Sequence, residues 1–136
     1  MEIRLLGKET TGGDSPTLYA TDHGTYLIQG WVVTEPEIVA KLGISEDDTY
    51  VEIYARLLGH LAKDGLSGVV ASRAAPIVHV MPDGNLIVQG RRVTDPALRA
   101  KMALPANEDC VEVARAALAA LVQEEDDLGA DDPPAA

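Results

Sequence analysis

The residues of this chain that could carry acid–base or metal chemistry are few and widely separated. Asp22 and His23 place a carboxylate beside an imidazole in a turn, His60 and His79 stand alone, and the one cysteine is Cys110. Three scattered histidines and one cysteine give no spacing typical of metal ligands. The Asp-His pair favours a turn over a catalytic base, because a second copy of the turn lacks the histidine. We therefore expect no enzyme, no cofactor and no metal.

That second copy belongs to an internal repeat. The phrase LIQGWVVTEP, Leu27 to Pro36, returns sixty residues later as IVQGRRVTDP, Ile87 to Pro96. At this offset, matches extend without a gap from residue 16 to residue 121. Chance gives only a few identities over such a length, so the sequence indicates a tandem duplication. Cys110 matches Tyr50 in the repeat, which predicts a buried apolar position for the thiol.

Each copy predicts a β-hairpin followed by a short helix. The first hairpin strands are Thr17–Thr21 and Ile77–Met81, and a glycine in each turn, Gly24 or Gly84, can take a positive φ. The quoted phrases supply the second strands. Thr34 and Thr94 are expected to be the N-caps of the helices, with Pro36 and Pro96 in the first turn and Glu37 completing a capping box with Thr34. The helices should end near Gly43 and before Pro105.

The second part of each copy is more ambiguous. Val51 and Ile53 alternate as in a strand, yet residues 50–61 also fit one helical face. We favour a strand over Tyr50–Ile53 and a helix from about Tyr54 to Lys63. In the second copy, Ala114–Val122 has strong helical propensity, and the start of its helix near Val113 is equally open.

These elements define the predicted organisation. Residues 1–15 should be a mobile segment, 16–61 the first repeat, 62–75 a linker, 76–123 the second repeat and 124–136 a disordered acidic tail. A copy of about 46 residues is near the lower size limit for folding alone. We therefore predict an α+β protein of two tandem β-hairpin–helix–strand–helix repeats, related by a pseudo-two-fold axis and sharing one aliphatic core, since the chain has no Phe.

The composition narrows the classes of partner that the chain is expected to bind. The formal net charge of −11 opposes non-specific attraction to nucleic acids and anionic membranes. No apolar run is long enough to span a membrane and the first residues do not resemble a signal peptide, so we expect a cytoplasmic protein. The single cysteine excludes an intramolecular disulfide framework.

The copies differ where a partner would bind. Repeat 1 carries seven acidic and two basic residues, and repeat 2 carries five of each. The shared Gln-Gly pairs, 29–30 and 89–90, predict a role in the fold: a bulge or close backbone approach for glycine and a backbone partner for glutamine. The next residues differ, so we expect Trp31, Arg91, Arg92 and Arg99 to bind partners. An equally weighted alternative makes Trp31 a core residue and the arginines a solvated strand end.

Two resemblances are carried by these motifs. The pattern TLYATDHGTYLIQGWVVTEPE, Thr17 to Glu37, resembles small uncharacterised proteins of actinobacteria, often near helix-turn-helix regulators; this resemblance implies no known activity. More weakly, Gly90-Arg91, Leu98-Arg99 and Met102-Ala103-Leu104 resemble the motifs of swapped-hairpin regulators and antitoxins of the AbrB kind. In copy one, Trp31 and Val39 replace both arginines.

The expected function follows from the acidity, the diverged copies and these resemblances. We predict a small acidic, non-enzymatic regulatory protein that acts by protein–protein binding. The acidic tail would hold a basic partner, and a homodimer is possible. The alternative is a DNA-binding regulator or antitoxin of the swapped-hairpin type that uses the basic cluster of repeat 2.

Overall fold

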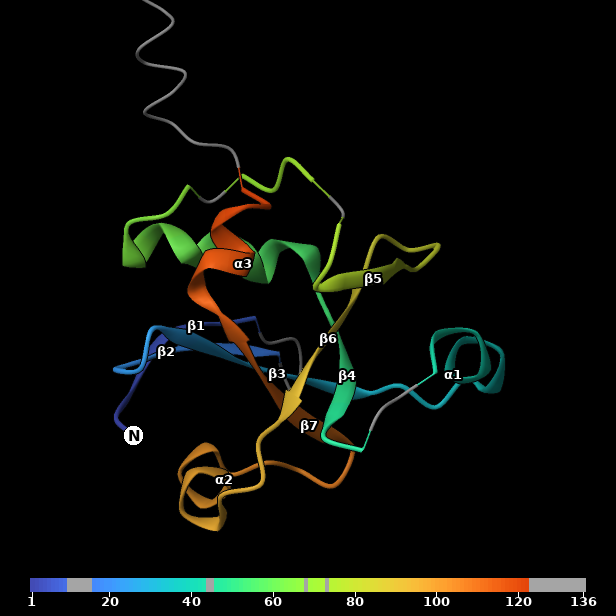
Figure 1. Cartoon of the computed structure of the whole chain (residues 1–136), viewed down its shortest axis with the longest axis horizontal. Coiled ribbons are helices and arrows are strands. Elements are labelled where there is room, and N and C mark those ends of the chain that lie inside the picture. The colour runs from blue at the N-terminus through green and yellow to red at the C-terminus, as the bar shows by residue number, and fades with distance from the viewer. Residues whose placement is uncertain (10–15, 44–45, 68, 73, 123–136) are drawn as a thin grey trace, which may run out of the picture.

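The computed structural model describes residues 1–9, 16–43, 46–67, 69–72 and 74–122. Within these ranges the chain is an α+β protein in which seven strands form one antiparallel sheet, with a few short helices around it (Figure 1). The strands are β1 Ile3–Lys8, β2 Thr17–Thr21, β3 Thr25–Val32, β4 Asp48–Ile53, β5 Ile77–Val80, β6 Leu86–Arg92 and β7 Glu108–Ala114. The helices are α1 Pro36–Leu42, the 3₁₀ helix η1 Ala55–Asp64, α2 Pro96–Met102 and α3 Arg115–Ala119. None of the helices in these ranges has the length and apolar character needed to cross a membrane.

Both predicted hairpins form, β2 with β3 and β5 with β6. Their turns use the glycines as expected, since Gly24 has φ 75° and Gly84 has φ 93°. Both values lie in the left-handed region that glycine adopts without steric cost. The turn chemistry read from the sequence is confirmed.

The two halves of the chain exchange strands. β3 pairs along nearly its whole length with β7, and only its last residues pair with β4. In the same way β6 pairs at length with β4 and at its end with β7. The registers correspond at a sixty-residue offset, because Trp31 faces Glu108 and Arg91 faces Asp48. The strands β3, β7, β6 and β4 therefore close a ring in which each hairpin completes the other half's sheet.

Gly30 and Gly90 lie where two strands cross in this ring. A Cβ on Gly30 would lie 2.5 Å from the carbonyl oxygen of Glu52, and one on Gly90 would lie 2.9 Å from that of Glu112. Any side chain would push the crossing strands apart, so only glycine permits this approach. The close backbone approach predicted for the shared glycines is confirmed.

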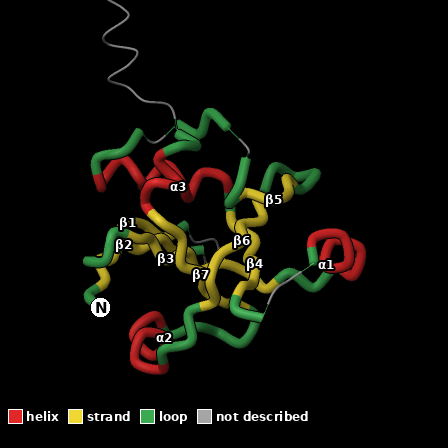
Figure 2. The backbone as a smooth tube through the Cα atoms, viewed as in Figure 1, coloured by secondary structure: helices red, strands yellow, loops and turns green. Residues whose placement is uncertain are grey.

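The main core draws on both halves. It is aliphatic except for Tyr26 and includes Leu18 and Leu58 from the first half with Val88 and Leu118 from the second. Two smaller clusters lie under α1 and α2, which stand apart at the periphery of the sheet (Figure 2). Each includes a buried residue from the opposite half, since Ile87 packs in the α1 cluster and Leu27 in the α2 cluster.

The helix starts differ from the prediction by one residue. Pro36 and Pro96 do open the helices, but the N-caps are Glu35 and Asp95 rather than the threonines before them. Asp95 accepts a hydrogen bond from the backbone of Ala97, whereas Glu35 makes no side-chain cap bond, so the predicted capping box is wrong. The short carboxylate of aspartate suits this geometry better than glutamate.

Two other expectations are corrected, and a third is confirmed. The mobile segment predicted for residues 1–15 is wrong at its start, because Ile3–Lys8 forms β1, pairs with β2 and buries Leu6. The favoured strand over Tyr50–Ile53 and the helix expected from about Tyr54 to Lys63 are confirmed as β4 and η1. The helix is a 3₁₀ helix whose three-residue period puts Leu58 and Leu61 on one face, and its last residues lie inside the predicted linker. In the second half, β7 continues to Ala114, which leaves α3 only Arg115–Ala119. The acidic tail 124–136 lies outside the described residues.

Candidate partner-binding surfaces

Trp31 is partly buried and packs in a group of two aromatic rings and an arginine. The end of β3 carries it, and its ring meets that of Tyr54 edge to face, with centroids 5.0 Å apart and planes at 87°. The guanidinium carbon of Arg56 lies 4.1 Å from the centroid of the Tyr54 ring. Val32, the next residue of β3, is 41% exposed but points to the opposite face of the strand, where it pairs with Val51. We call Trp31, Tyr54 and Arg56 the Trp31 surface; edge-to-face rings and a stacked arginine hold it in one arrangement.

Arg92 and Arg99 are occupied within the protein. The carboxylate of Asp109, only 6% exposed, receives Nε of Arg92 on one oxygen and Nη1 of Arg99 on the other, each at 3.0 Å. Arg99 also donates to the carbonyl of Val93 at 2.8 Å, and the backbone N–H of Cys110 donates to the same carboxylate at 2.8 Å. The buried charge is therefore fully paired, which a buried carboxylate requires. The structure brings these two arginines together around an internal anion.

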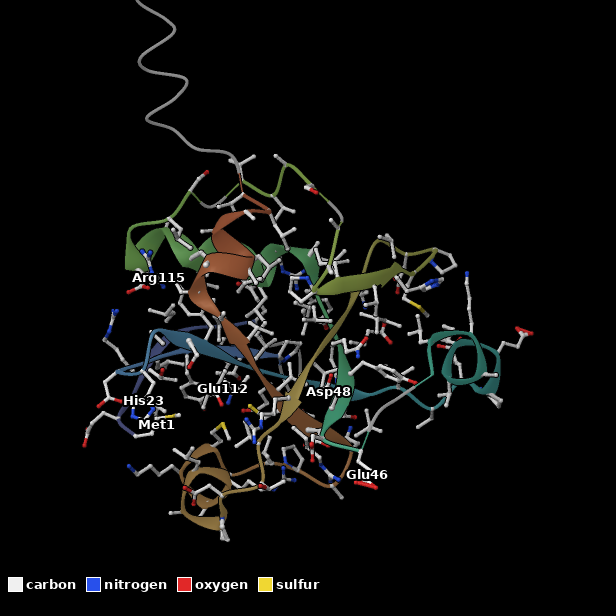
Figure 3. All side chains as sticks on the ribbon, viewed as in Figure 1. Met1, His23, Glu46, Asp48, Glu112 and Arg115 are labelled. Carbon is white, nitrogen blue, oxygen red and sulfur yellow. The ribbon has the colours of Figure 1, made fainter. Side chains whose placement is uncertain are left out.

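Arg91 has a different environment. It is exposed on β6, and within the described residues its guanidinium has no ion-pair partner. It lines a depression of about 330 Å³ with His23, Thr94 and Glu112. His23 and Glu112 lie near one another at this side of the sheet (Figure 3). Arg91 is thus the member of the basic cluster left available to a partner.

A pair of glutamine–carboxylate contacts was missed by the sequence interpretation. Gln29 donates to the Glu108 carboxylate at 2.7 Å, and Gln89 donates to the Asp48 carboxylate at 3.3 Å. The glutamines were expected to bond backbone atoms; instead each reaches a side chain of the opposite half. The signal was present, since Asp48 and Glu108 are both acidic at the sixty-residue offset. It could not be read without knowing that the halves exchange strands.

Cys110 and His60, two of the remaining candidates for chemistry, serve the structure. Cys110 is buried, and burial, together with the nearby Asp109 charge, raises the pKa of its thiol. His60 shares the Glu9 carboxylate with Arg56, and these two hydrogen bonds lower the pKa of Glu9. Among the described residues no group of His, Cys, Asp and Glu is arranged to hold a metal ion.

Asp64, at the end of η1, joins three elements. Burial raises its pKa, but hydrogen bonds from Tyr26, Arg115 and Arg4 outweigh that effect and the pKa is lowered. The Tyr26 hydroxyl donates to it at 2.6 Å, and burial and this carboxylate raise the pKa of Tyr26 to about 12. The arrangement keeps the tyrosine protonated and the carboxylate charged at neutral pH, which suits a structural junction.

Comparison with known proteins adds no assignment. No family model, curated protein or solved structure matches this chain.

Proposed function

We propose that this chain is a non-enzymatic regulatory protein that binds another protein through the Trp31 surface. The observation that carries the proposal is the composition of that surface. Trp31, Tyr54 and Arg56 belong to the three residue types most enriched in binding hot spots, and Tyr54 contacts both of the others. Their side chains are ordered before binding, which lowers the entropic cost of association.

The proposal includes a tandem duplication as the origin of the fold. The matching registers of β3 with β7 and β6 with β4 support it, as do the equivalent glycines at both strand crossings. After duplication, the position equivalent to Trp31 became Arg91. One scaffold thus presents an aromatic surface on one half and a cationic residue on the other.

Two observations favour the alternative function, DNA binding by a swapped-hairpin regulator. The exchanged strands agree with that architecture, and Arg91 is available to a phosphate. Two observations weigh against it. Arg92 and Arg99 already neutralise Asp109, and the net charge of −11 repels the phosphate backbone.

The test is quantitative affinity capture from the native cell with the full chain and matched variants. Trp31→Ala should reduce capture of the specific partner about thirtyfold, the loss of a hot spot worth about 2 kcal/mol. Arg56→Ala, which removes the cation stacked on Tyr54, should reduce it too. Val69→Asp, at an exposed valine (53% exposed), is the control and should capture normally. Equal capture by all four proteins would contradict the proposal.

A second measurement addresses the alternative. Labelled duplex DNA from the chain's own upstream region is titrated at low salt. We expect no saturable binding. Saturable binding that weakens steeply with salt and is lost in Arg91→Ala would replace our proposal with the DNA-binding alternative.

A further inference from the structure

An open cleft lies between the second hairpin and the start of α3. Its volume is about 430 Å³, and its walls are mostly apolar, formed by Pro76, Val78, Val113 and Ala117. Its polar wall is the Gln89–Asp48 pair. α3 and β5 stand on opposite sides of β6, and Asp48 is the first residue of β4 (Figures 1 and 3).

Comparison of the two halves explains why this polar pair is open. η1 and α3 begin with the same backbone geometry, since their N-caps, Tyr54 and Ala114, have φ/ψ of −69°/139° and −66°/142°. Three residues further on, the first half has the fully buried Leu57 and the second has the partly exposed Ala117. Beside the Gln89–Asp48 pair, alanines therefore stand at the two positions, 114 and 117, where the first half has Tyr54 and Leu57.

The consequence is a difference in burial of the two carboxylates. Glu108 is 3% exposed and accepts a 2.7 Å hydrogen bond from Gln29. Asp48 is partly exposed, and its bond from Gln89 is longer, at 3.3 Å. That bond uses Oδ2, and no described residue donates to Oδ1 or forms an ion pair with Asp48. A carboxylate with one oxygen open therefore faces an apolar cleft.

The chemistry of the cleft selects the ligand. The carboxylate requires a cation, and the aliphatic walls suit a chain of methylene groups. Oδ2 already accepts the bond from Gln89, so Asp48 offers mainly Oδ1, which fits the point charge of an ammonium better than the two-pronged guanidinium. The exposed carboxylates of Glu46 and Asp47 come just before it in the chain and add to the negative potential. Arg91, opposite Asp48 across the strands, is a neighbouring cation that competes for it, and Arg91 lines the other depression.

We propose that this cleft binds a lysine side chain of the partner protein. The inference rests on the proposed protein-binding function and specifies the partner's chemistry: an exposed lysine whose stem packs between Pro76 and Ala117 and whose ammonium bonds to Asp48. The overall charge of −11 favours such a basic partner.

The probe is an acetylated, amidated Leu-Lys-Leu peptide, titrated into the isotopically labelled full chain at neutral pH and followed by NMR. The backbone amide signals of Val78, Gln89 and Ala117 should shift saturably, with a Kd on the order of 1 mM for this single anchor. The same peptide with norleucine in place of lysine should bind at least fivefold more weakly. Equal shifts with both peptides would overturn the inference.

Variants separate the cleft from general charge. Asp48→Asn should weaken lysine-peptide binding at least fivefold, whereas Glu37→Gln, which removes a charge from α1, should leave it unchanged. Ala117→Leu restores the side chain of the first half and should close the cleft. Arg91→Ala should strengthen binding, because it removes a neighbouring cation. Unchanged amide spectra away from the cleft establish that each variant is folded.

Two other outcomes would show that the proposed lysine cleft is wrong. If n-butylammonium saturates the cleft at lower concentration than the peptide, the site serves a small amine and the inference is wrong. If Asp48→Asn and Ala117→Leu bind the peptide like the wild type, it is also wrong. Loss of partner capture in Trp31→Ala alone would then leave the proposed function standing without the lysine cleft.

Discussion

The strand crossings at Gly30 and Gly90 allow a sharp prediction. A Cβ added at Gly30 would lie 2.5 Å from the Glu52 carbonyl oxygen and 2.8 Å from Cγ2 of Ile53. Since real Cβ contacts stay above about 3 Å, β3 and β4 would have to separate by roughly 0.5 Å. A backbone carbonyl held in a sheet cannot rotate away. Overpacking of this kind costs about 1–3 kcal/mol, and we expect Gly30→Ala near 3 kcal/mol.

The equivalent substitution at Gly90 and a substitution at Gly84 give two smaller free-energy changes for comparison. At Gly90 the Cβ would lie 2.9 Å from the Glu112 carbonyl oxygen, so Gly90→Ala should cost about 1.5 kcal/mol. Gly84 has open space around it, and Gly84→Ala should cost about 1 kcal/mol from its positive φ alone. Urea unfolding followed by circular dichroism measures all three free energies. The reasoning is refuted if Gly30→Ala lies within about 0.5 kcal/mol of the wild type or costs less than Gly84→Ala.

Two further predictions concern charges. Arg99→Ala should lower the free energy of unfolding by about 2 kcal/mol, because it removes a hydrogen-bond donor from the buried Asp109 carboxylate. Arg91→Ala should change the free energy of unfolding by less than about 0.5 kcal/mol, and equal effects of the two substitutions in urea unfolding would contradict the assigned roles. The lowered pKa of Asp64 means that its contribution is complete above the ordinary pKa and is lost as pH falls below about 4. In thermal unfolding from pH 7 to pH 3, Asp64→Asn should therefore be less stable at pH 7 and lose less stability on acidification than the wild type. A parallel pH dependence would rule out this carboxylate as a contributor.

Local features of the fold were readable from the sequence because they depend on local chemistry. The hairpin strand Thr17–Thr21, the positive φ of Gly24 and Gly84, and the prolines at the helix starts each follow from a few neighbouring residues. The helix caps were misplaced because Thr94 and Asp95 are both plausible caps, and only the observed geometry selects between them.

The long-range features were not readable. Alternation at Val51 and Ile53 indicates a strand but does not say that its main partner is β6 of the other half. The pairing of Arg92 and Arg99 with Asp109 depends on that exchange, so two residues interpreted as partner-binding turn out to pair internally. β1 was missed because Arg4, Gly7 and Lys8 make it resemble a polar lead-in. Leu6 nevertheless reaches the main core, and Ile3 packs against the α2 cluster.

The central claim is that the two halves complete each other's sheet, so that neither proposed surface exists on half a chain. Residues 1–70 alone would lose β6 and β7, which supply most of the pairing of β4 and β3. The most direct test is thermal unfolding of this fragment, followed by circular dichroism, with its mass in solution determined by light scattering. We predict a fragment that is either largely unfolded or self-associated, its own β4 taking the place of β7 in a second copy. A monomeric fragment with a cooperative thermal transition would contradict the claim.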